Sequence, residues 1–278
     1  MRAIPFAPGV DCHQAVEAGN VVLLPNAGLP LAEEDWEVLR GIRETGSYHK
    51  NVAYKPCFDK LSGLDRMPAA TRERTHSILR RFSESATELA ARLLPRYQAT
   101  WRVDYASLRP VEEAGRKLPL KKRNDLLHTD AFPTRPTSGG LILRVFYNFH
   151  PSKSRVWLTS DPFASIAPRY AADAGLESIA ARGFFRRILS RRSAYDEFML
   201  AFHDYLKRNT DFQTNCPKYR LEFQPGSAWI VFTDVVPHAV EAGQFAVDQT
   251  LIVPRESLAS PEQAPVSILE KMAGCSLA

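Results

Sequence analysis

The sequence predicts an α+β fold whose core is a double-stranded β-helix (jelly roll), with N-terminal helices and a helical insertion between strands. Residues 1–98 carry apolar side chains mostly at helical spacing. From residue 99 to 255, short β-prone runs alternate with turn residues, which is typical of a jelly roll. We therefore expect a single domain over 1–278, with helical support in 1–98, the core in 99–255 and a C-terminal tail in 256–278.

Two segments before the core have the spacing of amphipathic helices. Residues 32–42 are one, and residues 71–94 are a longer one that Pro95 closes. Residues 21–24 form a short apolar run ahead of the turn PNAGLP, which predicts a strand. A third helical segment, about 176–209, interrupts the strands and carries aromatic residues at helical spacing. It also holds a cluster of arginines: Arg186, Arg187, Arg191 and Arg192.

The strands of the expected core follow one another along the second half of the chain. Residues 101–110 alternate between polar and apolar side chains, and 139–151 are strongly β-prone. Residues 154–160 form a further strand. Residues 222–240 contain a strand, a Pro-Gly turn, a second strand and the beginning of a third, and 249–254 form the last one.

Composition limits the class of protein. The net charge of +5 favours anionic partners but is too small to indicate nucleic acid. The four cysteines lie far apart without a C-x-x-C pair, which argues against structural zinc and against a disulfide framework. With neither a signal-peptide core nor an apolar run of about 18 residues, the sequence predicts a cytoplasmic protein. The oligomeric state is left open.

The stretch LLHTDAF, residues 126–132, places two metal-capable side chains one residue apart. In an extended segment, His128 and Asp130 project to the same face. His238 is the natural third ligand, because it begins a late strand that a jelly roll can bring alongside. Two histidines and one carboxylate leave coordination positions open and suit non-haem Fe(II). Zinc fits less well, since the chain has no H-E-x-x-H helix and no thiolate partner.

An iron centre of this kind draws electrons from a cosubstrate, for which 2-oxoglutarate is the leading candidate, with dioxygen as the oxidant. The far carboxylate of 2-oxoglutarate calls for a bidentate arginine. We rank Arg144, within an apolar strand, above Arg255, at the end of the last strand; a salt bridge or an outward-facing side chain is the alternative for Arg144. Thr250 or Asn148 supplies an added hydrogen bond in this interpretation.

Two longer stretches carry a family resemblance. RNDLLHTDAFPTRPTSGGLILRVFYNFHP and PGSAWIVFTDVVPHAVEAGQFAVDQTLIVP resemble the 3-deoxy-D-manno-oct-2-ulosonic acid (Kdo) hydroxylase family, most clearly over 101–255. The resemblance implies an Fe(II)- and 2-oxoglutarate-dependent dioxygenase of Gram-negative bacteria, with ascorbate as an accessory reductant. It implies hydroxylation at carbon 3 of the Kdo sugar of Kdo-lipid A, in the inner core of lipopolysaccharide.

This substrate is anionic, and the resemblance directs attention to basic residues that flank the proposed metal segment. An ordinary solvated surface charge is the alternative for each of them, and Asn51 and Tyr54 are added as parts of a lid over the pocket. The candidate substrate contacts are Arg109, Lys121, Lys122, Arg123, Arg135, Asn51 and Tyr54. The arginine cluster of 186–192 is predicted to hold the enzyme peripherally against the cytoplasmic face of the inner membrane.

Two other functions remain open on the sequence alone. The same iron chemistry could act on another small molecule or on a protein side chain. A protein of another class, a jelly-roll binding protein without oxidative chemistry, could keep the same strands. Succinate release on a panel of substrates would show which substrate the enzyme oxidises. Metal content and 2-oxoglutarate turnover would distinguish an enzyme from a binding protein without oxidative chemistry.

Overall fold

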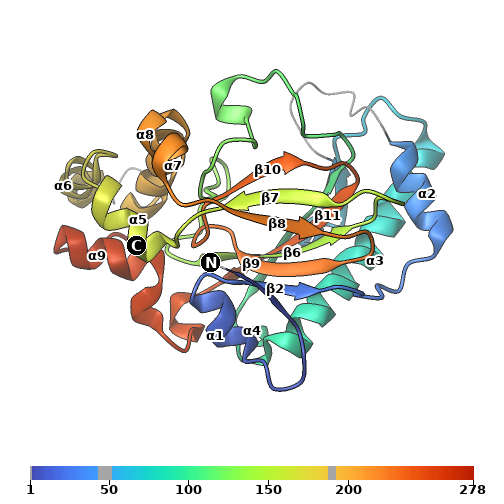
Figure 1. The fold of residues 1–278 in the computed structure, drawn as a ribbon, viewed down its shortest axis with the longest axis horizontal. Helices are drawn as coiled ribbons and strands as arrows, with labels where there is room; N and C mark the ends of the chain where they lie inside the picture. The colour runs from blue at the N-terminus through green and yellow to red at the C-terminus, as the bar shows by residue number, and fades with distance from the viewer. Residues whose placement is uncertain (1, 43–51, 187–191) are drawn as a thin grey trace.

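Two β-sheets form the centre of the fold in the computed structural model, which describes residues 2–42, 52–186 and 192–278 (Figure 1). The larger sheet has the strand order β1-β2-β9-β6-β11-β5-β3-β4, and the smaller has the order β10-β7-β8. All pairs are antiparallel except β1 with β2. The strands are β1 Ala3–Pro5, β2 Val21–Leu24, β3 Val52–Lys55, β4 Lys60–Ser62, β5 Arg102–Arg109, β6 Leu141–Asn148, β7 Arg155–Thr159, β8 Tyr219–Phe223, β9 Ala228–Phe232, β10 His238–Ala242 and β11 Ala246–Val253.

Helices lie around the sheets. The long helix α3 packs against the larger sheet, and α7 and α8 stand at one end of the smaller sheet, where β10 begins (Figure 1). None of the helices within the described ranges is long and apolar enough to cross a bilayer. The helices are α1 Cys12–Glu17, α2 Glu33–Gly41, α3 Ala69–Leu93, α4 Pro95–Gln98, α5 Phe163–Tyr170, α6 Leu176–Arg186, α7 Ala194–Arg208, α8 Thr210–Asn215 and α9 Pro265–Ala273, with 3-10 turns η1 Pro56–Phe58, η2 Leu120–Lys122, η3 Arg255–Ser257 and η4 Pro261–Gln263.

The core lies between the two sheets and beneath α3. Every residue of β6 and β11 is buried, because these central strands are covered on both faces. An aromatic cluster joins the sheets: Trp157 of β7 packs edge-on against Phe146 and Trp229, and Phe223 of β8 stacks on Trp229 with ring centroids 3.9 Å apart. This packing holds the strands that carry the functional site in fixed register.

The sequence-based strands of the core are present at 102–109, 141–148 and 155–159, close to their expected bounds. The first 98 residues differ, since their described part contributes four strands, where the sequence predicts a mainly helical segment with one or two. These strands have only three or four residues each, too few for a periodic pattern to appear. They extend the larger sheet at its edges, where β2 pairs with β9 and β3 pairs with β5.

Two further segments differ from their sequence-based descriptions. Helices between β7 and β8 begin at Phe163 and continue to Asn215, a wider range than 176–209. Residues 126–132 are not a regular strand, because their only ladder contact is an isolated bridge between His128 and His238. Main-chain hydrogen bonds nevertheless hold the segment in place, so the side chains of His128 and Asp130 still point to the same side.

Candidate metal centre

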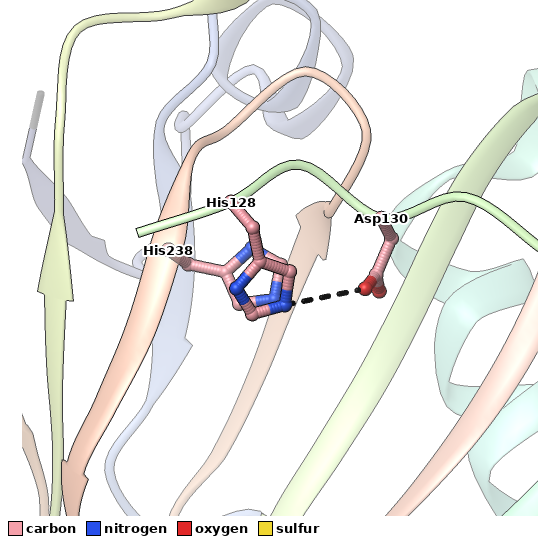
Figure 2. A group of neighbouring side chains, drawn as sticks. All are labelled: His128, Asp130 and His238. Atoms are coloured by element: carbon pink, nitrogen blue, oxygen red, sulfur yellow. Dashed lines mark ion pairs between the residues drawn. The ribbon is translucent and has the colours of Figure 1, made fainter. Parts of the chain in front are cut away.

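Three side chains converge where the segment after η2 meets the beginning of β10. The backbones of His128 and His238 exchange two hydrogen bonds, of 3.1 and 2.9 Å, and the Asp130 N–H donates to the Thr233 carbonyl at 2.9 Å. One ligand atom from each of His128, Asp130 and His238 lies within 4.8 Å of the others. Figure 2 shows the two imidazoles and the carboxylate pointing toward one another. This separation suits a single metal ion.

Hydrogen bonds fix the tautomer of both imidazoles. Nδ1 of His128 lies 2.7 Å from the carbonyl of Leu126, and Nδ1 of His238 lies 2.9 Å from the carbonyl of Val236. A carbonyl only accepts, so each Nδ1 carries the proton and each Nε2 keeps its lone pair. Burial lowers the pKa of both rings, which favours the neutral form that a metal requires.

Asp130 is held in its ionised form. Burial by itself would raise its pKa, but the positive charge of Arg144, with a hydrogen bond from the Thr233 side chain, lowers it well below the usual range. The closest contact joins Nη2 of Arg144 to Oδ2 of Asp130 at 3.1 Å. Arg144 therefore supports the proposed ligand directly, in line with the salt bridge that the sequence left as an alternative.

A small cavity opens beside the triad and is unusually rich in arginine. Its lining includes Arg109 from β5, Arg144 from β6 and Arg155 from β7. Asp248 of β11 pairs with two of them, at 2.7 Å from Arg109 Nε and 3.4 Å from Arg144 Nη1. The lining residues are Arg109, Asn124, His128, Asp130, Arg144, Phe146, Arg155, Trp157, His238 and Val240. Such a cavity suits a small anion.

Arg155 was missed from the sequence and is the least satisfied of these cations. It forms no ion pair with any described carboxylate, its Nη1 donates to the Gly243 carbonyl at 3.1 Å, and its Nε has no partner. Burial, assisted by the charge of Arg109, lowers its pKa to about 10, so it is still a cation at neutral pH. Trp157 adds a second unpartnered donor, Nε1, and its ring stacks on His238 at 5.0 Å. The sequence did carry a signal for Arg155, since an arginine that begins an apolar strand needs a partner when it is buried.

Asn148 and Thr250, the expected hydrogen-bond donors to a cosubstrate, have other surroundings. The Asn148 amide donates to the carbonyls of Lys153 at 3.0 Å and Phe223 at 2.9 Å, which ties β6 to the smaller sheet. Thr250 is buried in β11 opposite Arg144 in the strand register. Neither residue lines the cavity beside the triad.

Arg255 lies at a different pocket. It belongs to η3 and pairs with Glu270 at 2.6 Å and Glu256 at 3.1 Å. The pocket it lines also includes Thr100 and Ser138 but none of the triad. The structure thus brings Arg144 to the metal centre and leaves Arg255 outside it.

Arg135 is held inside a stack of side chains rather than presented to the cavity. Its guanidinium lies 4.0 Å from the ring centroid of Tyr105 and 4.1 Å from that of Phe132, and it forms an ion pair with buried Asp104. Phe132 follows Asp130 by two residues. The stack therefore anchors the chain immediately after the proposed carboxylate ligand.

The other basic candidates lie on or near η2. Lys121 pairs with Asp204 of α7 at 2.9 Å, and Arg123 pairs with Asp125 at 2.6 Å. Lys122 is exposed on the same turn. These residues lead directly into the metal segment, and their role as substrate contacts stays a prediction.

Of the two residues predicted to form part of a lid, only Tyr54 lies within the described residues. Tyr54 is buried in β3, and its hydroxyl donates to Asp59 at 2.9 Å. It does not line the cavity beside the triad. Asn51 lies outside the described residues.

The predicted membrane cluster is described only in part. Arg192 donates a hydrogen bond to the carbonyl of Pro133, close to the metal segment. Arg186 is the last residue of α6, and Arg187 and Arg191 lie outside the described residues.

A His-x-Asp pair with a buried histidine, a distant buried histidine with its Nε2 free, and an arginine-lined cavity define a class: the non-haem metal oxygenases with a facial triad. The chain belongs to the 3-deoxy-D-manno-oct-2-ulosonic acid (Kdo) hydroxylase family, whose model matches residues 7–276. It is therefore an enzyme of the hydroxylase type, as the sequence predicts. A comparison with curated protein sequences gave no significant match.

Solved structures of the Kdo hydroxylase KdoO, described as a non-haem Fe(II) α-ketoglutarate-dependent dioxygenase, are similar along the whole chain. The complex with α-ketoglutarate and Fe(III) has a TM-score of 0.88 at 30% identity and covers 100% of this chain and 98% of its own. The cobalt(II) complex has a TM-score of 0.87 at 32% identity, covering 99% and 93%. The succinate and Fe(III) complex has a TM-score of 0.85 at 31% identity, covering 99% and 93%.

Proposed function

We propose that this enzyme hydroxylates the Kdo sugar of Kdo-lipid A at carbon 3, with Fe(II) at the triad and 2-oxoglutarate as cosubstrate. The observation that carries the proposal is the triad itself: His128, Asp130 and His238 converge beside a cavity that suits a small anion. The family match adds the sugar class. Lipid A as the carrier and carbon 3 as the position rest on the family resemblance.

The residues fit an Fe(II) ion in donor type and in protonation. Two neutral imidazole Nε2 atoms and one carboxylate oxygen can bind one face of an octahedral ion. The carbonyls that hold each Nδ1–H also orient the rings, and Arg144 orients Asp130. When bound, the iron couples oxidative decarboxylation of 2-oxoglutarate, to succinate and carbon dioxide, with insertion of one atom of dioxygen into a C–H bond.

Arg155 is the residue that we propose for the far carboxylate of 2-oxoglutarate, with Arg109 beside it. Arg144 was ranked first from the sequence, but its guanidinium contacts both Asp130 and Asp248. Arg155 has no carboxylate partner among the described residues, and this distinguishes it from Arg144, since the buried Nε–H is without a partner in both. A planar guanidinium in this position can hold a carboxylate through two parallel hydrogen bonds.

The two sheets are, in our proposal, the double-stranded β-helix expected from the sequence, within one domain. The six strands β6 to β11 divide evenly between the larger sheet (β6, β9 and β11) and the smaller sheet (β7, β8 and β10), and their pairs are antiparallel. Pairing of β2 with β9 joins the first residues to the last third of the chain, which supports a single unit. A peripheral position on the cytoplasmic face of the inner membrane would bring the enzyme to its lipid substrate.

Mass spectrometry of Kdo-lipid A tests this function directly. Incubation with the protein, Fe(II), 2-oxoglutarate and ascorbate should add one oxygen atom to the Kdo unit and release succinate in equal amount. NMR of the released sugar should show that the carbon 3 methylene has become a hydroxylated methine. A gain of oxygen on the acyl chains instead, or succinate release without an oxidised sugar, would contradict the proposal.

A further inference from the structure

Lys207 is a buried cation for which the metal centre described above has no use. This residue of α7 is only 4% exposed. Its ammonium donates to the Lys121 carbonyl at 3.3 Å and forms no ion pair with any carboxylate in the part of the chain that the structure describes. Burial lowers its pKa to about 8, so it is still mostly charged at neutral pH. A buried ammonium with one neutral acceptor is costly unless a further partner binds it.

The ammonium lies on the side of α7 that packs against the metal segment, because it donates to the Lys121 carbonyl and follows His203, whose ring contacts His128, by one helical turn. Among the charges that act on Lys207, the carboxylate of Asp130 has the largest effect, ahead of Asp204 and Asp125. In the opposite direction, the charge of Lys207 contributes to the lowered pKa of His128. A divalent ion at the triad would neutralise the negative charge of Asp130 and leave a net positive charge there. Lys207 would then face a cation, and an anion between the two would relieve the repulsion.

Helices α7 and α8, the first of which carries Lys207, are joined to the metal segment by hydrogen bonds and a ring contact. His203, one helical turn earlier on α7, has Nδ1 2.8 Å from the Thr129 carbonyl, and its ring packs edge-on against His128 at 4.8 Å. Gln213 of α8 accepts from the Leu127 N–H at 3.0 Å and donates to its carbonyl at 2.8 Å. These contacts fix α7 against the metal segment, so the place of Lys207 relative to the triad is a property of the fold.

Lys207 and Arg155 approach the triad from different ends of the smaller sheet. The register pairs His238 with Thr159 at the end of β7, whereas Arg155 begins that strand four residues earlier. Helices α7 and α8 stand at the end where β10 begins (Figure 1). An anion held by Lys207 is therefore distinct from the one proposed for Arg155.

We propose that Lys207 binds the carboxylate of the sugar-acid substrate and thereby orients the sugar over the metal. The carboxylate would replace the Lys121 carbonyl as the partner of the ammonium, which requires η2 to yield slightly when the substrate binds. This inference rests on the proposed function for the identity of the sugar acid. It adds a specific contact on α7, because a buried ammonium distinguishes a carboxylate from a neutral group of the same shape.

The test compares the methyl glycoside of Kdo with its carboxamide, which keeps the shape and removes the charge. Two measurements apply to each sugar: kcat/KM for hydroxylation by the iron enzyme, and calorimetric binding to the cobalt(II)-loaded protein with 2-oxoglutarate. The variants are Lys207→Met, Lys207→Arg and, as matched control, Arg208→Met. Arg208 is the next residue of the same helix, carries the same charge and is largely exposed.

The wild type should prefer the acid to the amide by about 10- to 100-fold, the range of a hydrogen bond to a charged group. Lys207→Met should bring the two sugars within about threefold of each other through loss on the acid alone, and Lys207→Arg should restore part of the preference. Arg208→Met should leave the preference unchanged. An equal loss on acid and amide, or no loss, would overturn the role of Lys207.

Two controls separate this inference from folding and from the proposed function. The melting temperature of Lys207→Met should not fall, because the variant removes a buried charge that has only one neutral acceptor, so a lower value would reveal a folding defect. If the wild type neither binds nor oxidises a Kdo sugar, the proposed function fails and the inference fails with it. If it does both and Lys207→Met keeps the preference for the acid, only the inference fails.

Discussion

Replacing Arg155 with methionine should weaken 2-oxoglutarate binding about 100-fold. Arg155 lies in the cavity beside the triad with a free Nε–H and no described carboxylate partner. Two charge-assisted hydrogen bonds to a carboxylate would contribute about 1.5–3 kcal/mol each. Burial and the neighbouring positive charge of Arg109 already disfavour the charged form of Arg155 and lower its pKa. Part of the attraction between Arg155 and the bound carboxylate therefore only offsets this cost. A net loss of about 3 kcal/mol corresponds to about 100-fold in Kd.

The assay is calorimetric titration of 2-oxoglutarate into cobalt(II)-loaded protein, with the KM for 2-oxoglutarate as a second measure. Arg255→Met is the matched control, because Arg255 pairs with Glu256 and Glu270 at another pocket and should change the Kd less than about threefold. Arg144→Met should weaken metal binding first, since Arg144 contacts Asp130. The assignment is refuted if Arg155→Met binds 2-oxoglutarate normally or if Arg255→Met shows the larger loss.

Three further predictions address the metal, the backbone and pH. His128→Ala should weaken Fe(II) binding by more than the roughly 10- to 100-fold that loss of a supporting contact costs. The control is His76, a histidine of α3 that does not line the cavity beside the triad, and metal analysis should find His76→Ala normal. Gly243→Ala should lower stability by about 1–3 kcal/mol and raise the KM for 2-oxoglutarate, because a Cβ there would lie 2.7 Å from Cγ of Arg155 at a φ of +136°; unchanged urea unfolding would contradict this. Burial raises the pKa of Asp234 to about 7, so the folded protein keeps a proton that the unfolded chain loses near pH 4, and stability should fall as pH rises between about 4 and 7, by up to about 4 kcal/mol. Urea unfolding of Asp234→Asn should lack this part of the pH dependence, and an identical pH profile in both proteins would count against it.

The central strands were predictable because they are long. The runs at 101–110, 139–151 and 154–160 have enough residues for β-propensity and turn signals to act together. The short strands of the first 62 residues were harder to recognise, since strands of three or four residues show almost no period and are stabilised by pairing with distant partners. His128 and Asp130 were expected to be co-facial in an extended segment, and tertiary hydrogen bonds give their side chains this direction without a regular strand.

The sequence by itself determined the ligand set and the class of chemistry. The one-residue spacing of His128 and Asp130 is local, and extended backbone alone makes such side chains co-facial. The match of residues 7–276 to the Kdo hydroxylase family model then assigned the chain to the sugar hydroxylases.

Only the tertiary structure decided which charged residues surround that ligand set. Arg144, Arg155 and Arg255 are alike in sequence terms, since each lies within or beside an apolar strand. Their roles diverge because strand register and burial choose their partners: Arg144 meets Asp130, Arg255 meets Glu270 and Arg155 meets no carboxylate among the described residues. Electrostatic partners come from elements far apart along the chain, and spacing in the sequence carries no record of those distances.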